Sequence, residues 1–132
     1  PPLAAKLIEV RTSRFRRSNL ADVFAEISTL VALRGEPLAA QLYDYGNDGS
    51  SYWMVMHRYP TTLKLWAEDH ADGRRPLSEL LAAYALVIEG VSMLHRRHIS
   101  HFDLKADNFL CIPHGSSMSS RPNGLALEGS DA

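Results

Sequence analysis

The chain has 132 residues, of which 45% are hydrophobic and 22% are charged, the balance of a folded domain. Its formal net charge of −1 gives no electrostatic reason to expect binding to nucleic acid or to an anionic membrane surface. No apolar run approaches the roughly 18–20 residues of a membrane span, so we expect none. The single cysteine, Cys111, excludes an internal disulfide, so we expect a reducing, cytoplasmic compartment.

Hydrophobic periodicity predicts strands and helices along most of the chain. The expected elements are a strand over 3–10, a helix over 19–34, strands over 39–45 and 52–57, a short helix over 61–69 and a helix over 77–94. The first helix is expected to be capped by Ser18 or Asn19 and to end at Gly35 and Pro37. The turn residues 46–49 are expected to join the two middle strands.

The last of these helices is the clearest element, because its apolar residues repeat at helical spacing for about five turns. After it, residues 113–132 are rich in Ser and Gly, and we expect them to form a mobile tail. Strands and helices in this mixed order predict an α+β fold.

A charged segment, His-Phe-Asp-Leu-Lys-Ala-Asp-Asn, follows the long helix. Phosphoryl transfer needs a carboxylate to orient the attacking hydroxyl, a cation beside the moving group and an oxygen ligand for Mg²⁺. Asp103, Lys105 and Asn108 offer these three groups in one short loop. The alternative is a charged turn in which Asp103 or Asn108 only satisfies backbone donors.

This loop resembles the catalytic loop of eukaryotic protein kinases, and Lys105 makes it more similar to the serine/threonine branch. The predicted elements also follow the order of a kinase from its third strand to its catalytic loop, over about residues 3–112. The resemblance implies part of a kinase domain, with an N-lobe part at 1–57, a hinge and C-lobe part at 58–112, and a tail at 113–132. It implies ATP and Mg²⁺ as cofactors and the Ser or Thr hydroxyls of a protein as substrate.

The resemblance also assigns roles to single residues. Asp103 is the expected catalytic base, Lys105 balances charge on the γ-phosphoryl group, and Asn108 binds Mg²⁺. Lys6 lies in an A-x-K strand and is expected to reach the α- and β-phosphates, held by an ion pair with Glu26. Considered alone, Lys6 is better interpreted as a snorkelling strand residue and Glu26 as a solvated helix residue, and the loop downstream favours the functional pair.

The strand before the hinge resembles the fifth strand of the family. In that interpretation Met56 occupies the gatekeeper position, and the backbone of His57 and Tyr59 pairs with the edge of adenine. Ala4 above and Leu110 below enclose the base. The alternative is a plain buried strand followed by a turn.

Several family features are not found. No glycine-rich loop precedes Lys6 and no Asp-Phe-Gly follows Asn108, although Asp131 is a candidate start for a variant of that motif. Phe102 replaces the usual Arg before the catalytic Asp, and its ring is expected to pack near Leu94. Without that Arg, regulation through a phosphorylated activation loop is not expected. The competing interpretation is a non-catalytic kinase-like module that binds a partner protein, and the Mg²⁺-binding Asp of Asp-Phe-Gly is the feature that separates the two. A small-molecule phosphotransferase of similar fold is a third interpretation.

Three histidines, His95, His98 and His101, have a spacing that suits one helical face and a zinc site. No cysteine or carboxylate completes a ligand set, so we expect His101 to support the loop backbone instead. Cys111 is expected to be a small buried apolar residue beside the loop.

Overall fold

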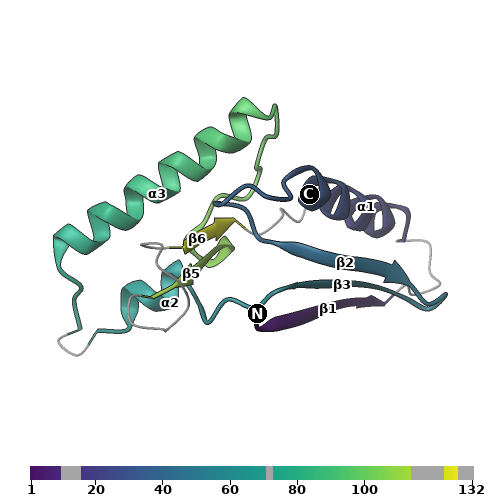
Figure 1. Ribbon diagram of the computed structural model, residues 1–132, viewed down its shortest axis with the longest axis horizontal. Coiled ribbons are helices and arrows are strands. Elements are labelled where there is room, and N and C mark those ends of the chain that lie inside the picture. The colour runs from purple at the N-terminus through teal and green to yellow at the C-terminus, as the bar shows by residue number, and fades with distance from the viewer. Residues whose placement is uncertain (10–15, 71–72, 114–123, 128–132) are drawn as a thin grey trace.

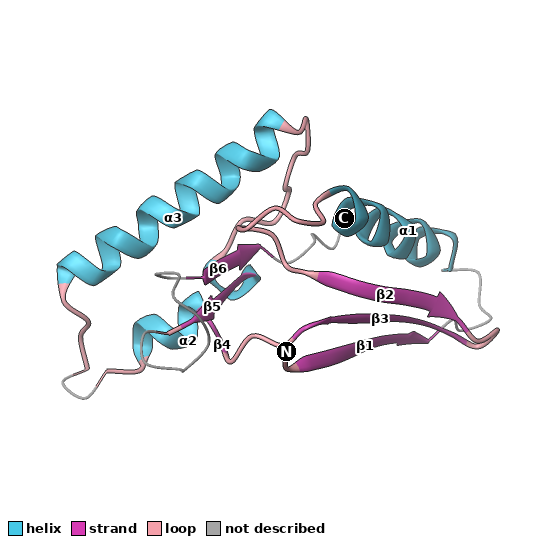
Figure 2. Ribbon diagram, viewed as in Figure 1, coloured by secondary structure: helices cyan, strands magenta, loops and turns pink. Residues whose placement is uncertain are grey.

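The computed structural model describes residues 1–9, 16–70, 73–113 and 124–127. Its elements are β1 (Leu3–Glu9), α1 (Arg16–Ala32), β2 (Leu42–Asn47), β3 (Ser51–His57), β4 (Thr61–Thr62), α2 (Leu63–Glu68), α3 (Leu77–Arg96), the 3₁₀ turn η1 (Ala106–Asn108), β5 (Phe109–Ile112) and β6 (Gly124–Leu127). The predicted α+β class is confirmed. Figure 2 shows the strands as two separate groups, and we call β1–β3 with α1 the first lobe and the remaining elements the second lobe.

The first lobe is an antiparallel sheet of order β1-β3-β2 with α1 lying along one face (Figure 1). In its register, Ala4 lies opposite Met56 and Lys6 opposite Met54, so these four side chains share one face of the sheet. Apolar residues of α1, of β2 and the segment before it, and of β3 form the core between sheet and helix, namely Val23, Ile27, Leu30, Ala40, Leu42, Met54 and Met56. This core fixes the distance between β1 and α1.

The hairpin between β2 and β3 differs from the prediction. Strand β2 continues through Gly46 to Asn47, and the connection is made by Asp48 to Ser50. The Asp48 carboxylate accepts hydrogen bonds from the N–H groups of Ser50 and Ser51, at 2.9 and 2.7 Å. Gly46 is needed for packing rather than for a turn, because a Cβ there would lie 2.4 Å from a ring carbon of Trp53.

The first helix begins at Arg16, three residues before the predicted start. Ser18 and Asn19 therefore lie inside the helix, and their predicted capping role is wrong. The predicted end is close to the observed one, since α1 finishes at Ala32 and Gly35 follows with φ of +85°. That left-handed conformation favours glycine.

The second lobe contains a short sheet of order β4-β5-β6. The residues predicted as one helix over 61–69 are divided into β4 and α2, and Thr62 caps the helix by accepting a hydrogen bond from the Leu65 N–H at 3.3 Å. Strand β6 pairs with β5, with Leu127 opposite Phe109. Residues 124–127 thus form a strand that the sequence did not predict, and the rest of the tail after residue 113, Asp131 included, lies outside the described residues.

The connection between α1 and β2 joins the two lobes. Leu33 and Ala39 from this connection are buried in the same cluster as Leu94 of α3 and Phe109 of β5. Glu36, also in the connection, forms an ion pair with Arg97 at the end of α3. The first lobe is thus anchored to the elements that lead into and out of the charged loop.

One side of α3 is exposed. Leu77, Leu81, Tyr84 and Ile88 are each more than half exposed, although α3 packs against β6 on its other side (Figure 1). By length and composition α3 is apolar enough to cross a membrane, a test that the core helix of a globular protein also passes, and 17% of its most apolar stretch is buried. This face has the composition of an interior surface.

We expect the isolated chain to self-associate through this face of α3. Each large apolar side chain removed from water contributes about 1.5–3 kcal/mol, enough for a few such residues to hold two copies together. The variants Leu81→Glu and Tyr84→Glu should be monomeric at micromolar concentrations in analytical ultracentrifugation, whereas the original sequence and the control Ser78→Glu should associate. A monomeric original chain with an ordinary cooperative thermal transition contradicts this expectation.

Candidate active site

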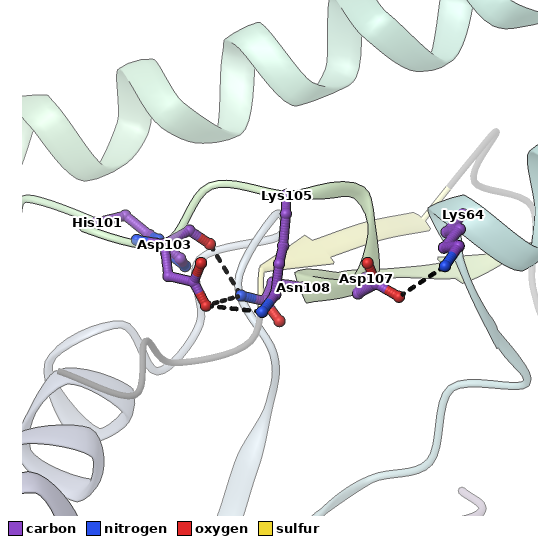
Figure 3. Close-up of polar contacts among 6 residues, drawn as sticks. All are labelled: Lys64, His101, Asp103, Lys105, Asp107 and Asn108. Atoms are coloured by element: carbon purple, nitrogen blue, oxygen red, sulfur yellow. Dashed lines mark hydrogen bonds and ion pairs between the residues drawn. The ribbon is translucent and has the colours of Figure 1, made fainter.

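The loop after α3 brings Asp103, Lys105 and Asn108 together, as predicted (Figure 3). The Lys105 ammonium lies 3.0 Å from Oδ2 of Asp103. The side-chain N–H₂ of Asn108 donates to the backbone oxygen of Asp103 at 2.8 Å and to Oδ2 at 3.2 Å. The turn η1 positions Asn108 for these bonds, because its N–H donates to the carbonyl of Lys105. The three residues form one hydrogen-bonded unit.

The Asp103 carboxylate is held in its charged form. The hydrogen bond from Lys105, followed by that from Asn108, lowers the pKa of Asp103 below the ordinary aspartate value. The side chain is 44% exposed, so a substrate can reach it. At neutral pH this carboxylate can accept a hydrogen bond and orient the group that donates it, but it is a weak base.

Asn108 has the geometry of an oxygen ligand. Its amide nitrogen is used by Asp103, so the amide orientation is fixed and Oδ1 is left as an acceptor. An amide oxygen suits a hard cation such as Mg²⁺. In the described part of the chain no three His, Cys, Asp or Glu side chains gather as a metal-binding group, so the alternative zinc site at His95, His98 and His101 has no support.

His101 supports the loop backbone, as predicted, since its Nδ1 accepts a hydrogen bond from the Asp103 N–H at 3.1 Å. The expectation for Phe102 is wrong: its side chain is 84% exposed, and Leu94 is buried with Met93 and Phe109 instead. Phe102 lies at a bend of the loop, where the half-buried His101 turns its ring to the Asp103 backbone and the Phe102 ring is left in solvent.

Lys6 and Glu26 form the predicted ion pair between β1 and α1. The Lys6 ammonium lies 2.8 and 3.0 Å from the two carboxylate oxygens. Glu26 is the one charged side chain that is buried in the described part of the chain, at 4% exposed, whereas the Lys6 side chain is 35% exposed. Leaving a buried partner unpaired costs about 3–5 kcal/mol in a fully buried pair, and less here because Lys6 reaches the surface.

The predicted adenine-binding residues surround the end of β3. Met56 is buried in the first-lobe core, Ala4 lies opposite it in the register, and both Tyr59 and Leu110 pack against the same core. The rings of Tyr59 and His57 meet edge to face with centroids 4.8 Å apart. Burial raises the pKa of Tyr59, so its hydroxyl stays neutral.

Some of the backbone hydrogen-bonding groups near the hinge are already paired within the protein. The His57 N–H donates to the carbonyl of Gln41 at 2.9 Å, which ties the end of β3 to the segment before β2. In the described residues the Tyr59 N–H donates to no backbone acceptor, which leaves it as a donor for a ligand. The structure thus gathers the residues of this group into one region, and their pairing with adenine stays a prediction.

Two polar contacts near the loop were missed by sequence reasoning. Lys64 of α2 and Asp107 of η1 lie 3.9 Å apart, a pairing that no local pattern indicates. Arg75 stacks on the Trp66 ring at 4.0 Å and forms an ion pair with Glu79 at 3.1 Å. Only the spacing of four between Arg75 and Glu79 gave a signal in the sequence. The Lys64 contact joins α2 to η1, and the Arg75 contact with Trp66 joins α2 to the segment before α3.

The sequence of the chain is similar to those of known protein kinases. A sequence profile of the protein kinase domain matches residues 2–118. The chain is similar to a probable serine/threonine-protein kinase of Dictyostelium discoideum, 36% identical over 112 residues, and to human myosin light chain kinase 3, 35% identical over 113 residues. It is 28% identical over 114 residues to MAP kinase-interacting serine/threonine-protein kinase 2 of Xenopus laevis.

The aligned regions cover 84% of this chain in all three comparisons, but they cover only 5%, 13% and 23% of the respective relatives. The chain therefore spans a small part of the length of the curated relatives that it matches.

The depressed pKa of Asp103 leads to a measurable expectation. In a carboxyl ¹³C NMR titration of the chain, Asp103 should protonate below the ordinary aspartate range, and Lys105→Met should move its pKa upward because the largest cause is removed. Because the folded pKa is the lower one, any stabilisation by this pair is complete above the unfolded pKa and is lost as the pH falls through the folded pKa.

Asp48 is the matched control for this titration. Hydrogen bonds from Ser51 and Ser50 lower its pKa, and neither involves Lys105. Its titration should be the same in the original chain and in Lys105→Met. An Asp103 pKa that does not move in the variant contradicts the assigned cause.

Proposed function

The chain belongs to the protein kinase family, and we propose that the protein containing it transfers the γ-phosphoryl group of ATP to Ser or Thr hydroxyls of a protein substrate. One observation carries this proposal: Asp103, Lys105 and Asn108 form a single hydrogen-bonded unit on an exposed loop. The names of the relatives support the choice of Ser or Thr.

In this reaction Asp103 accepts a hydrogen bond from the substrate hydroxyl and orients its oxygen. Ordinary carboxylate basicity is sufficient, because the hydroxyl proton is lost late in a loose transition state. Lys105 already lies beside Asp103, so its ammonium is placed to balance negative charge on the γ-phosphoryl group. The Asn108 amide holds the Asp103 side chain in one orientation.

The residues present fit the cofactors that the family implies. Asn108 supplies an oxygen for Mg²⁺, which when bound neutralises charge on the phosphate oxygens. Lys6, aimed by Glu26, is a cation for the α- and β-phosphates. Ala4, Met56 and Leu110 supply an apolar enclosure for adenine next to the backbone of His57 and Tyr59.

A non-catalytic kinase-like module remains the second candidate. It is favoured by the fact that the described residues contain no group of three His, Cys, Asp or Glu side chains suited to a metal ion, and that Oδ2 of Asp103 is already used by Lys105 and Asn108. The same nucleotide-binding residues would then hold ATP without transfer, and a partner protein would be bound instead. The experiment below separates the two.

We also propose a cytoplasmic location. Burial raises the pKa of the Cys111 thiol to about 11, so it stays protonated and unreactive at neutral pH, as suits a structural cysteine. Fractionation of cells that express a tagged full-length gene product tests this. Recovery with the membrane fraction contradicts it.

Replacing the proposed base Asp103 should strongly reduce phosphoryl transfer without weakening ATP binding. In the full-length gene product containing this chain, Asp103→Asn should lower kcat by about 100- to 10,000-fold on a Ser- or Thr-containing protein substrate, with ATP affinity nearly unchanged. Asp44→Asn, which neutralises an exposed carboxylate on β2, is the matched control and should retain full activity. Equal turnover in Asp103→Asn and the original protein would falsify the role of Asp103. ATP binding without transfer in the original protein would favour the non-catalytic module.

Phe102 leads to an expectation about regulation. An Arg before the base can hold a phosphorylated loop by charge-assisted hydrogen bonds, whereas the exposed Phe102 ring has neither charge nor donor. Phosphatase treatment of the full-length gene product should therefore leave turnover unchanged, and Phe102→Arg should make turnover sensitive to the same treatment. A large loss on dephosphorylation of the original protein, restored by rephosphorylation, contradicts this.

A further inference from the structure

The ion pair between Lys64 and Asp107 lies on the same exposed surface as the proposed base (Figure 3). Asp107 follows Asp103 by four residues, in the turn η1, and Lys64 is the second residue of α2, which packs beside that turn. The side chains are 51% and 53% exposed, so both charged groups remain in contact with solvent. Neither residue takes part in the unit formed by Asp103, Lys105 and Asn108.

The pair is within reach of residues that flank the acceptor hydroxyl. Four residues of extended chain span at most about 13–14 Å, and this sets the upper limit on the distance between the backbones of Asp103 and Asp107. A substrate segment in extended form covers the same length in four residues. A charged side chain near the acceptor can therefore meet Lys64 or Asp107 while the hydroxyl is at Asp103.

We propose that Lys64 is a specificity-determining residue that selects against basic side chains near the acceptor hydroxyl. This inference rests on the proposed function. By pairing with Asp107, Lys64 cancels the attraction that this carboxylate would otherwise exert on an Arg or Lys of the substrate. The other carboxylate of the loop, Asp103, is compensated by Lys105 in the same way. The surface therefore favours substrates whose neighbouring side chains are neutral or acidic.

The looseness of the pair is part of the argument. At 3.9 Å and half exposed, it is a weak ion pair, so Lys64 can turn toward a carboxylate on the substrate without a large loss of stability. A basic side chain must instead compete with Lys64 for Asp107 at close range. The expected discrimination between an acidic and a basic side chain is about two- to five-fold per charge, as for other exposed pairs.

The test uses a set of unphosphorylated peptides with one Ser, in which a single Arg or a single Glu is moved position by position on either side. Binding of each peptide to the full-length gene product is measured by fluorescence anisotropy at low salt, and transfer is measured on the same set. Binding is read separately from transfer, so a protein that binds peptides but transfers nothing refutes the proposed function and still tests Lys64. The variants are Lys64→Met, Lys64→Glu, Lys64→Arg and the double variant Lys64→Met/Asp107→Asn.

At one or two positions, Lys64→Met should raise the affinity for the Arg peptide relative to the Glu peptide by about two- to five-fold, and Lys64→Glu should raise it further. Lys64→Arg should behave like the original protein, and the double variant should lose the gain because Asp107 is no longer charged. Arg74→Met, which removes an exposed cation from the loop before α3, is the matched control and should change nothing.

The proposal is overturned if the Arg-to-Glu ratio is the same in the original protein and in Lys64→Met at every position. It is also overturned if Arg74→Met changes the ratio as much as Lys64→Met, because net charge alone then explains the effect. A lower melting temperature in Lys64→Met with an unchanged ratio shows that the pair only holds α2 against η1.

Discussion

The burial of one charged side chain, Glu26, constrains the whole first lobe. A carboxylate in an apolar core is tolerated only if it is paired and hydrogen-bonded, and Lys6 supplies both of its oxygens with a partner. The pair fixes the rotation of α1, because Glu26 must face the sheet, and it fixes which side of β1 faces inward. The register then places Ala4 on that same side, opposite Met56. One ion pair thus decides which groups of the first lobe face the proposed nucleotide site.

The constraint extends to the second lobe through packing. The segment after α1 carries Leu33 and Ala39 into a cluster with the end of α3 and with β5, so α1 cannot rotate without disturbing the elements on both sides of the charged loop. The ion pair between Glu36 and Arg97 adds a polar contact at the same junction. Because protein interiors are closely packed, a rotation of one lobe would disturb the packing of this junction. The Lys6 ammonium and the Asp103 carboxylate are therefore held on a shared support although they lie in different lobes.

The sequence was most informative where one residue type at one spacing has few physical explanations. The distance from Lys6 to Glu26 and the spacing within the charged loop predicted contacts that the structure contains. It was misleading where the role of a residue depends on a contact with a residue elsewhere in the chain. Gly46 was interpreted as a turn residue because its contact with Trp53 cannot be seen in the sequence. Strand β6 was missed because a four-residue strand needs β5 beside it, and local composition carries no record of that pairing.

Each aspartate of the charged loop is paired with a lysine, Asp103 with Lys105 and Asp107 with Lys64. In the proposed reaction substrates replace these partners. Lys105 neutralises Asp103, and Asn108 holds the same carboxylate, so the unit is stable without a nucleotide. In the proposed reaction the phosphates attract Lys105, and the oxygen of Asp103 that it leaves becomes an acceptor for the substrate hydroxyl. The exposed pair of Asp103 and Lys105 is weak enough for either partner to be replaced. It is also short enough to hold both side chains in position before that happens. Glu26 is buried, so losing Lys6 would leave an unpaired charge in the core, whereas the exposed Asp103 can exchange Lys105 for the substrate hydroxyl in the proposed reaction.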